Sequence, residues 1–300
     1  MKKLFATNVP TDEDVKLETF LSALPKEPGF SISVINDCGD RNEQLRITTH
    51  LQTLFDRTPV SFCEVQGLHA DLEAAGCLID AIDAKFGGTA PGIILPNVAF
   101  RHPEVSGDAN GAPFAYIVIL KLLIISTIRG RTLSLLKHFY GIESVRVFEP
   151  REVLESIVAT GHLGREWVNH IAENQFRSFV FQPLAAARLC QGFEVPYRKE
   201  NLACPAPGSV VWFVDKHGNC KTTVTTEMCE PFPKDGDTLA TKFGNLPYFR
   251  RLTDAPLGKP AVTTGSSGLG AGPNDRFLEI AVRMGNAAKE LRISVGSEVF

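Results

Sequence analysis

Two short stretches of this 300-residue chain combine side chains that could bind a polar ligand. The stretch Asp215-Lys-His-Gly-Asn219 lies between two runs of strand-forming residues and is followed by Thr222 and Thr223. The Asn amide offers a hydrogen-bond donor and an acceptor together, and the His217 ring can pack against another flat ring. Asp37 directly follows the strand-like run SISVIN, and an ionised carboxylate can accept from two adjacent hydroxyl groups.

Both stretches also have an ordinary structural explanation. A Gly-Asn pair in a hairpin turn accommodates positive φ angles. Asp37 with Gly39 close behind it is typical of a chain reversal. Taken alone, each stretch favours that explanation, and a binding site is indicated only by further motifs along the chain.

The first two thirds of the sequence alternate between strand and helix patterns. The expected strands are 31–36, 92–95, 145–148 and a buried pair within 116–128. The expected helices are 13–24, 68–86, 151–159 and 165–174. This alternation predicts an α/β domain over residues 1–196, with a mostly parallel sheet and flanking helices.

The composition changes after residue 196. Residues 197–208 contain prolines and few helix formers, which indicates a linker. Beyond it, strand patterns recur without long helices, at 209–214, 222–226, 260–264 and 277–283. We therefore expect an all-β, barrel-like C-terminal domain over residues 209–300.

Charge and cysteine content narrow the class of protein. The net charge is −3 and no Lys- or Arg-rich run occurs, so neither nucleic acid nor a membrane surface is an expected partner. The most apolar run, Tyr116–Ile128, is too short to span a bilayer. No secretory leader is indicated at the N-terminus. The seven cysteines lack metal-site spacing, so we expect a cytoplasmic protein with reduced thiols and no metal.

Several motifs resemble those of the S-adenosylmethionine hydroxide adenosyltransferases and their halide-using relatives, the fluorinases and chlorinases. The C-terminal motifs are the 215–219 turn with its Thr-Thr, TGSSG at 264–268, FLEIAVRMGNAAKEL at 277–291 and VGSEV at 295–299. The N-terminal motifs are INDCGD at 35–40, ADLEAAGCLIDA at 70–81 and FVFQPLAAARLCQG at 179–192. The likeness is stronger in the C-terminal motifs. Relative to the family pattern, LGAGPNDR at 269–276 is an apparent insertion before FLEIAV.

The resemblance implies a fold, a ligand and a set of binding residues. Family members join an α/β domain to a β-barrel domain and displace methionine from S-adenosylmethionine at the ribose 5′ carbon. That small nucleoside compound would be substrate or ligand here, with no other cofactor. Asp37 would face the ribose, Asn219 the adenine edge, and His217, in place of the family's Phe, would stack on the base. Ser266 and Ser267 would bond the methionine end.

The residues with which the family makes hydroxide are not matched. Leu95 stands at the position of the family's Asp, and Phe176 at that of its His. Arg101, His102 and Arg129 lie near the remaining positions but out of register. Since free water is a weak acid, a general base is needed to make hydroxide, and neither Leu95 nor Phe176 can act as one.

Three hypotheses remain for the function. The chain is an adenosyltransferase with a rearranged site that recruits Arg101, His102 or Arg129, or it uses a halide near Ser178, or it is a non-catalytic nucleoside-binding or assembly module. Replaced catalytic positions beside better kept C-terminal motifs favour the third hypothesis over the second, and leave the first open. Under the third hypothesis the chain is a pseudoenzyme.

The resemblance also implies an assembly. Relatives form trimers in which the ligand lies between the N-terminal domain of one subunit and the C-terminal domain of its neighbour. A homotrimer is therefore expected, with Asp37 and Asn219 meeting across a subunit contact. The sequence assigns no role to the 269–276 insertion, and a small packed thiol is the simplest account of Cys38.

Overall fold

The computed structural model describes residues 30–85, 90–99, 112–119, 121–174, 176–268, 270 and 272–300. The expected helix at 13–24 lies outside these residues. The chain forms two compact units, of which unit 1 comprises 1–74 and 85–205 and unit 2 comprises 75–84 and 206–300. Helix α3 (Ala70–Asp83) therefore contributes its first turn to unit 1 and its remainder to unit 2.

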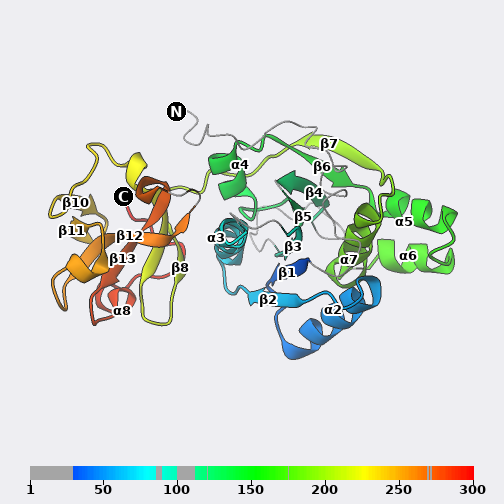
Figure 1. Ribbon diagram of the computed structural model, residues 1–300, viewed down its shortest axis with the longest axis horizontal. Coiled ribbons are helices and arrows are strands. Elements are labelled where there is room, and N and C mark those ends of the chain that lie inside the picture. Colours follow the sequence, from blue (N-terminus) through cyan, green and yellow to red (C-terminus); the bar gives the residue numbers. More distant parts are fainter. Residues whose placement is uncertain are drawn as a thin grey trace. The chain divides into compact units, whose positions relative to one another are not determined.

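Unit 1 is built on a mixed sheet of seven described strands in the order β2-β1-β3-β5-β4-β6-β7 (Figure 1). The strands are β1 (Ser31–Asn36), β2 (Val60–Glu64), β3 (Gly92–Asn97), β4 (Phe114–Ile119), β5 (Leu122–Thr127), β6 (Ser144–Phe148) and β7 (Tyr197–Asn201). The pairs among β2, β1, β3 and β5 are parallel, and those among β5, β4, β6 and β7 are antiparallel. The predicted α/β class is confirmed, with parallel pairing confined to half of the sheet.

Two features of the sequence explain the antiparallel half. Strands β4 and β5 are the buried pair predicted within 116–128, and only two residues separate them. A connection that short can only reverse the chain, so these strands pair antiparallel. Residues 197–201, expected as the start of a linker, instead form edge strand β7 against β6. Its polar sequence YRKEN suits an edge strand, because most of its side chains are exposed to solvent.

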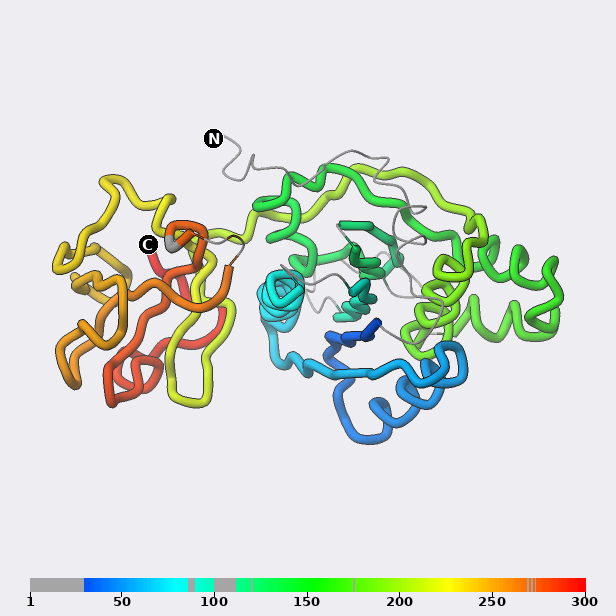
Figure 2. The backbone as a smooth tube through the Cα atoms, in the orientation of Figure 1, coloured from blue at the N-terminus to red at the C-terminus, as the bar shows by residue number. Residues whose placement is uncertain are grey.

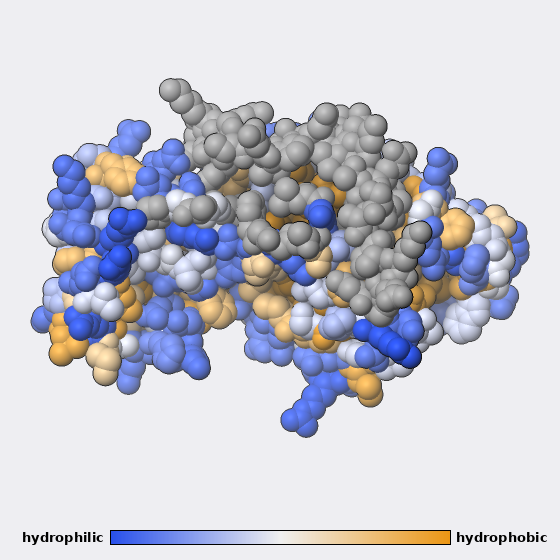
Figure 3. Space-filling view, viewed as in Figure 1, coloured by the Kyte–Doolittle hydropathy of each residue, from blue (hydrophilic) through white to orange (hydrophobic). Residues whose placement is uncertain are grey.

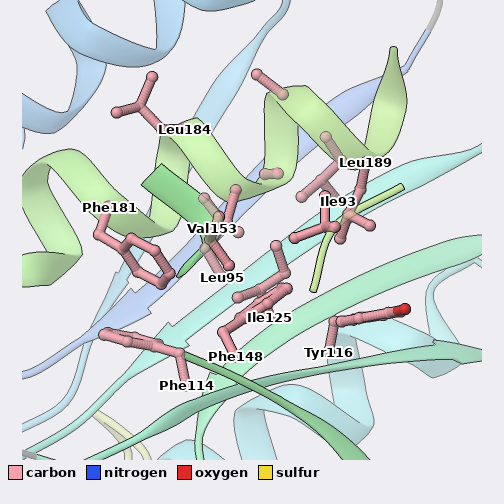
Figure 4. Packing of buried hydrophobic residues seen from close by; sticks show 14 of the residues in the cluster. Ile93, Leu95, Phe114, Tyr116, Ile125, Phe148, Val153, Phe181, Leu184 and Leu189 are labelled. Atoms are coloured by element: carbon pink, nitrogen blue, oxygen red, sulfur yellow. The ribbon is translucent and has the colours of Figure 1, made fainter. Parts of the chain in front are cut away.

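Helices cover both faces of this sheet. On one face lie α2 (Arg41–Leu54), α5 (Pro150–Ala159), α6 (Glu166–Ala172) and α7 (Arg177–Cys190), and α4 (Ser134–Tyr140) lies on the other (Figures 1 and 2). Figure 4 shows Phe181 of α7 pointing towards the strands, and its ring centroid lies 5.9 Å from that of Phe148. These side chains belong to a buried cluster of unit 1, which stabilises the strands that lead to the candidate site.

Unit 2 is built on a sheet of six described strands in the order β10-β11-β12-β13-β9-β8. The strands are β8 (Val211–Val214), β9 (Cys220–Thr225), β10 (Thr238–Thr241), β11 (Gly244–Phe249), β12 (Pro260–Gly268) and β13 (Arg276–Val282). The C-terminal segment links the two edges, because Val299 N–H donates to Ser209 O at 2.8 Å and Val299 O accepts from Lys242 N–H at 2.8 Å. The predicted sheet-rich class of the C-terminal domain is confirmed, and its described strands form an open sheet whose two edges are joined by these bonds, without a closed barrel.

The second part of α3 is an integral part of unit 2. Trp212 of β8 is 1% exposed and packs so closely on Gly76 that a Cβ at residue 76 would collide with the indole. Lys221 pairs with Asp80 at 3.2 Å and Arg276 with Asp83 at 2.6 Å. These contacts join residues far apart in the sequence.

No helix in the described part of the chain is long and apolar enough to cross a bilayer. Where Figure 3 shows described residues, hydrophilic and hydrophobic side chains are interspersed on the visible face.

Candidate functional site

The carboxyl ends of the parallel strands in unit 1 meet at one edge of the sheet, where ligands collect in open α/β folds. Asn36 is the register partner of Glu64 on one side and of Asn97 on the other. Asp37 follows Asn36 and is half-buried. Its Oδ2 accepts a hydrogen bond of 3.3 Å from Ala99 N–H, in the loop after β3. The predicted carboxylate therefore lies at the edge formed by the carboxyl ends of the parallel strands.

Asn36 is a further polar group at this edge. Its side chain is 1% exposed, and neither its amide oxygen nor its amide nitrogen has a hydrogen-bond partner among the described residues. An unsatisfied buried polar group costs about 1–3 kcal/mol, so such groups are rare and are often satisfied by water or a ligand. A ligand held by Asp37 could supply that partner.

His69, Asp71 and Arg131 form a polar cluster that joins the start of helix α3 to the loop after β5. Arg131, after β5, donates to Asp71 three times, from its backbone N–H at 2.8 Å, from Nε at 3.3 Å and from Nη2 at 3.1 Å. Its Nη2 also lies 2.9 Å from Nδ1 of His69, in the loop after β2. Because β2 and β5 flank β1 and β3 in the sheet, this cluster belongs to the same edge as Asp37.

The guanidinium determines the protonation of His69. An Arg side chain can only donate, so Nδ1 of His69 is the acceptor and Nε2 carries the proton. Burial and the charge of Arg131 lower the pKa of His69, and the opposing effect of the Asp71 carboxylate is smaller. His69 is therefore a neutral imidazole that can donate from Nε2, and its free lone pair is already engaged.

The expected catalytic positions are placed as follows. Leu95 is 1% exposed within the core shown in Figure 4. Phe176 is 54% exposed and stacks on Phe179 with ring centroids 5.6 Å apart. Ser178, in the first turn of α7, is 7% exposed. Arg129 lies in the loop after β5 and is half-buried.

Arg101 and His102 lie outside the described residues. Of the two candidate catalytic residues that the structure describes, Ser178 lies in helix α7, whereas Arg129 follows strand β5 at the same edge of the sheet as Asp37. Cys38 is also half-buried, with Sγ 3.7 Å from Asp37 Oδ1.

In unit 2, the turn between β8 and β9 is held by a single carboxylate. Asp215 Oδ1 accepts from the backbone N–H groups of His217 at 2.8 Å and Asn219 at 2.9 Å. Oδ2 accepts from the side-chain Nδ2 of Asn219 at 2.9 Å. Burial raises the pKa of Asp215, but these hydrogen bonds outweigh it and the pKa is lowered overall. The carboxylate is therefore ionised and can only accept.

This arrangement decides which atom of Asn219 is available. Since Asp215 can only accept, the amide nitrogen of Asn219 must face it, and the amide oxygen is directed elsewhere. Within the described residues, no hydrogen bond reaches Asn219 Oδ1. Asn219 therefore presents an acceptor that suits a ligand N–H group, while the neighbouring His217 is exposed.

Helix α8 (Ala287–Leu291) braces the turn. Gly218 has φ of +82° and lies against Asn286, where any Cβ would collide with the Asn286 side chain. Its carbonyl accepts from Ala288 N–H at 3.0 Å, and Asn286 caps the helix by accepting from Lys289 N–H at 2.8 Å. Two of the motifs singled out in the sequence thus pack together and keep the turn rigid.

The other residues of these motifs have different environments. Thr222 and Thr223 are buried, and their hydroxyls donate to the carbonyls of Leu278 at 2.8 Å and Gly208 at 2.6 Å, so they are structural. Ser267 is 2% exposed, with its hydroxyl 2.8 Å from Asp80 Oδ2 and 2.5 Å from Lys221 Nζ.

Ser266 is exposed, and its backbone N–H donates to Glu279 Oε1 at 3.3 Å. Ser266 is therefore the more accessible of the two serines. Asp37 belongs to unit 1, whereas His217, Asn219, Ser266 and Ser267 belong to unit 2. No metal-binding cluster of His, Cys, Asp or Glu is present among the described residues.

Comparison with known proteins finds a family match within unit 2. Residues 209–300 match the family model of the SAM hydroxide adenosyltransferase C-terminal domain. No curated protein sequence matches the chain significantly.

Two solved structures share the fold. An uncharacterized conserved protein from Thermotoga maritima has a TM-score of 0.65 and 17% identity, over 90% of this chain and 100% of its own. A conserved hypothetical protein from Thermus thermophilus has a TM-score of 0.55 and 17% identity, over 89% of this chain and 97% of its own.

Proposed function

Because residues 209–300 are a C-terminal domain of the SAM hydroxide adenosyltransferase family, we propose that this chain binds S-adenosylmethionine or a related adenosine compound. The observation that carries the proposal is the rigid 215–219 turn. There Asp215 holds the amide of Asn219 so that its oxygen is free to accept a hydrogen bond. The 6-amino group of adenine is a donor of the matching kind. The exposed His217 ring beside it supplies a surface on which a base can stack.

The remainder of the ligand is assigned to groups of matching chemistry. Asp37 accepts from the two ribose hydroxyls, and the unsatisfied amide of Asn36 supports the same sugar. Ser266, with Ser267 behind it, bonds the methionine end. Since Asp37 and Asn219 belong to different units, we further propose that a homotrimer brings them together from neighbouring subunits.

We propose that binding is not followed by rapid attack of water. Leu95 and Phe176 cannot accept a proton, and the available lone pair of His69 is already engaged by Arg131. Losing general-base assistance typically costs about two to four orders of magnitude in rate. These observations favour a nucleoside-binding module over an active hydrolase, and none of them favours the halide reaction.

Isothermal titration calorimetry of the full chain with S-adenosylmethionine, adenosine and 5′-chloro-5′-deoxyadenosine tests binding. Asp37→Asn and Asn219→Ala should each weaken binding about 10- to 100-fold, the value of a lost charge-assisted or base-specific hydrogen bond. The matched controls are Asp56→Asn, at a side chain that is 91% exposed, and Asn245→Ala, at an exposed residue of β11. Absence of heat with all three compounds would refute the proposal.

Chromatography of the same mixtures separates a binder from an enzyme. Adenosine and methionine should not accumulate above the rate in buffer, and their release would show that hydroxide is made by other residues. Analytical ultracentrifugation should give the mass of a trimer, whereas a monomer would exclude a site shared between subunits.

A further inference from the structure

A cavity lies within unit 2, at the end of β9 opposite the 215–219 turn. Its volume is about 680 Å³, and it is lined by residues of β9, of the segment from Met228 to Pro233 and of β10, together with Ser209 and Phe300. The turn precedes Cys220, whereas the cavity begins at Val224. At about 3.3 Å per strand residue, the two places are roughly 15–20 Å apart along β9. The cavity shares no lining residue with the proposed nucleoside site.

The size and the apolar surface of this cavity suit a small organic molecule. Ligand pockets typically enclose about 300–1,000 Å³ and are lined mainly by apolar side chains. Met228 and Phe300 are 38% and 39% exposed, although both are large and apolar. Val224 and Leu239 extend the apolar surface. An aromatic ring could pack against these side chains, because thioether and phenyl groups contact rings favourably.

The charges of the cavity favour a cation. Glu230 and Asp237 line it, and the lining contains no Lys, Arg or His among the described residues. Asp237 Oδ2 accepts from Lys234 N–H at 2.8 Å, whereas Glu230 makes no hydrogen bond or ion pair in the described part of the chain. The ammonium of Lys242, at the end of the β10–β11 hairpin, pairs with Glu298 at 3.9 Å. Two carboxylates are thus present without a basic residue in the lining.

We propose that this cavity is a binding site for a small organic cation with an aromatic body, separate from the nucleoside site. The ammonium group would lie near Glu230 and Asp237, and the ring would lie on Met228 and Phe300. An anion of the same shape would meet two like charges, and a neutral analogue would lose the ion pair.

Three indoles that differ in one terminal group test the charge preference. Tryptamine, tryptophol and indole-3-propionate carry an ammonium, a hydroxyl and a carboxylate on the same two-carbon chain. In calorimetry with the full chain, tryptamine should bind most tightly and indole-3-propionate most weakly. Equal affinities, a preference for the anion, or no binding of tryptamine at millimolar concentration would overturn the proposal.

Variants locate the binding site. Glu230→Gln should weaken tryptamine about two- to fivefold, the range of an exposed ion pair, and leave tryptophol unchanged. Glu227→Gln, at an exposed glutamate outside the lining, should change neither. Ala240→Trp should fill the cavity and abolish binding of all three indoles.

The comparison of Glu230→Gln with Glu227→Gln decides the question even where Ala240→Trp fails to fold. An equal effect of both glutamate variants would show that the indoles bind elsewhere. Asn219→Ala and saturating S-adenosylmethionine should leave tryptamine binding unchanged. Loss of tryptamine binding under either condition would mean that the two sites are one, whereas failure of S-adenosylmethionine to bind would leave the cavity result intact.

Discussion

The Asp215→Asn substitution is expected to reverse the base preference of the 215–219 turn. In the native turn, the Asp215 carboxylate accepts from the amide nitrogen of Asn219 at 2.9 Å and leaves the amide oxygen for the ligand. An Asn at position 215 keeps its oxygen on the backbone N–H groups of His217 and Asn219, and its own NH2 group then faces Asn219. Two NH2 groups cannot bond each other, so the Asn219 amide should rotate and turn its nitrogen outward.

The size of the effect follows from the hydrogen bonds that change. A neutral hydrogen bond contributes about 1 kcal/mol net, and an unmatched polar pair costs about 1–3 kcal/mol. Adenosine presents an amino donor at position 6 and inosine a carbonyl acceptor. The native protein should therefore prefer adenosine about 10- to 100-fold, and Asp215→Asn should prefer inosine by a similar factor.

Calorimetry with adenosine and inosine measures this directly. Asp215→Ala is the matched control, because it frees the Asn219 amide to adopt both orientations and should bind both nucleosides weakly with little preference. Ellipticity and the thermal midpoint should be recorded for each variant, since the turn loses charged hydrogen bonds. If Asp215→Asn folds and keeps the native preference for adenosine, the assigned orientation of Asn219 is wrong.

Three other predictions concern the packing and the charges. Asp71→Ala should lower the free energy of unfolding by about 2–4 kcal/mol, measured by urea denaturation, because it leaves the 22%-exposed Arg131 without its carboxylate. The His69 ring should titrate below the reference pKa of 6.5 in NMR, and Arg131→Gln should raise that pKa. The neutral His69 ring contributes to the free energy of unfolding above its unfolded-state pKa. That contribution is lost as the pH falls through the lower pKa of the folded state. Gly76→Ala should cost about 1–3 kcal/mol and shift Trp212 fluorescence to the red by forcing the indole outward.

Each of these has its own control. Asp56→Ala, at a side chain 91% exposed, should leave stability within about 0.5 kcal/mol of the native value. A His69 pKa that does not move in Arg131→Gln would show that the guanidinium is not its partner. The cost of Gly76→Ala should vanish in a Trp212→Ala background, and an equal cost there would mean that the added methyl group clashes elsewhere.

Elements with regular hydrophobic patterns could be predicted from the sequence, and polar elements could not. Buried strands such as β1 and the β4–β5 pair were confirmed. Helix α2 was missed because most of its residues are polar, and only Ile47 and Leu51 are buried. Its start depends on Asp40, which accepts from Asn42 N–H at 2.8 Å and Glu43 N–H at 3.1 Å, a local signal that is easily overlooked.

Parts of the candidate site could likewise be predicted from the sequence, and other parts could not. The 215–219 turn is local, so its residues could be recognised in sequence. The cluster of His69, Asp71 and Arg131 joins the start of α3 to a loop about 60 residues further along the chain, and is visible only in the folded chain. The resemblance assigned Ser267 to the methionine end of the ligand, but its hydroxyl donates to Asp80, which is 187 residues away in the sequence.

The division of helix α3 limits how this protein can be dissected. A fragment that begins at residue 206 would lack residues 75–84, which cover the indole of Trp212 and neutralise Lys221 and Arg276. Such a truncation would expose an apolar surface and two unbalanced cations, and it should be prone to aggregation. For the same reason, residues 206–300 cannot be exchanged on their own, and a chimera made by swapping them would have to carry its own version of that helical segment.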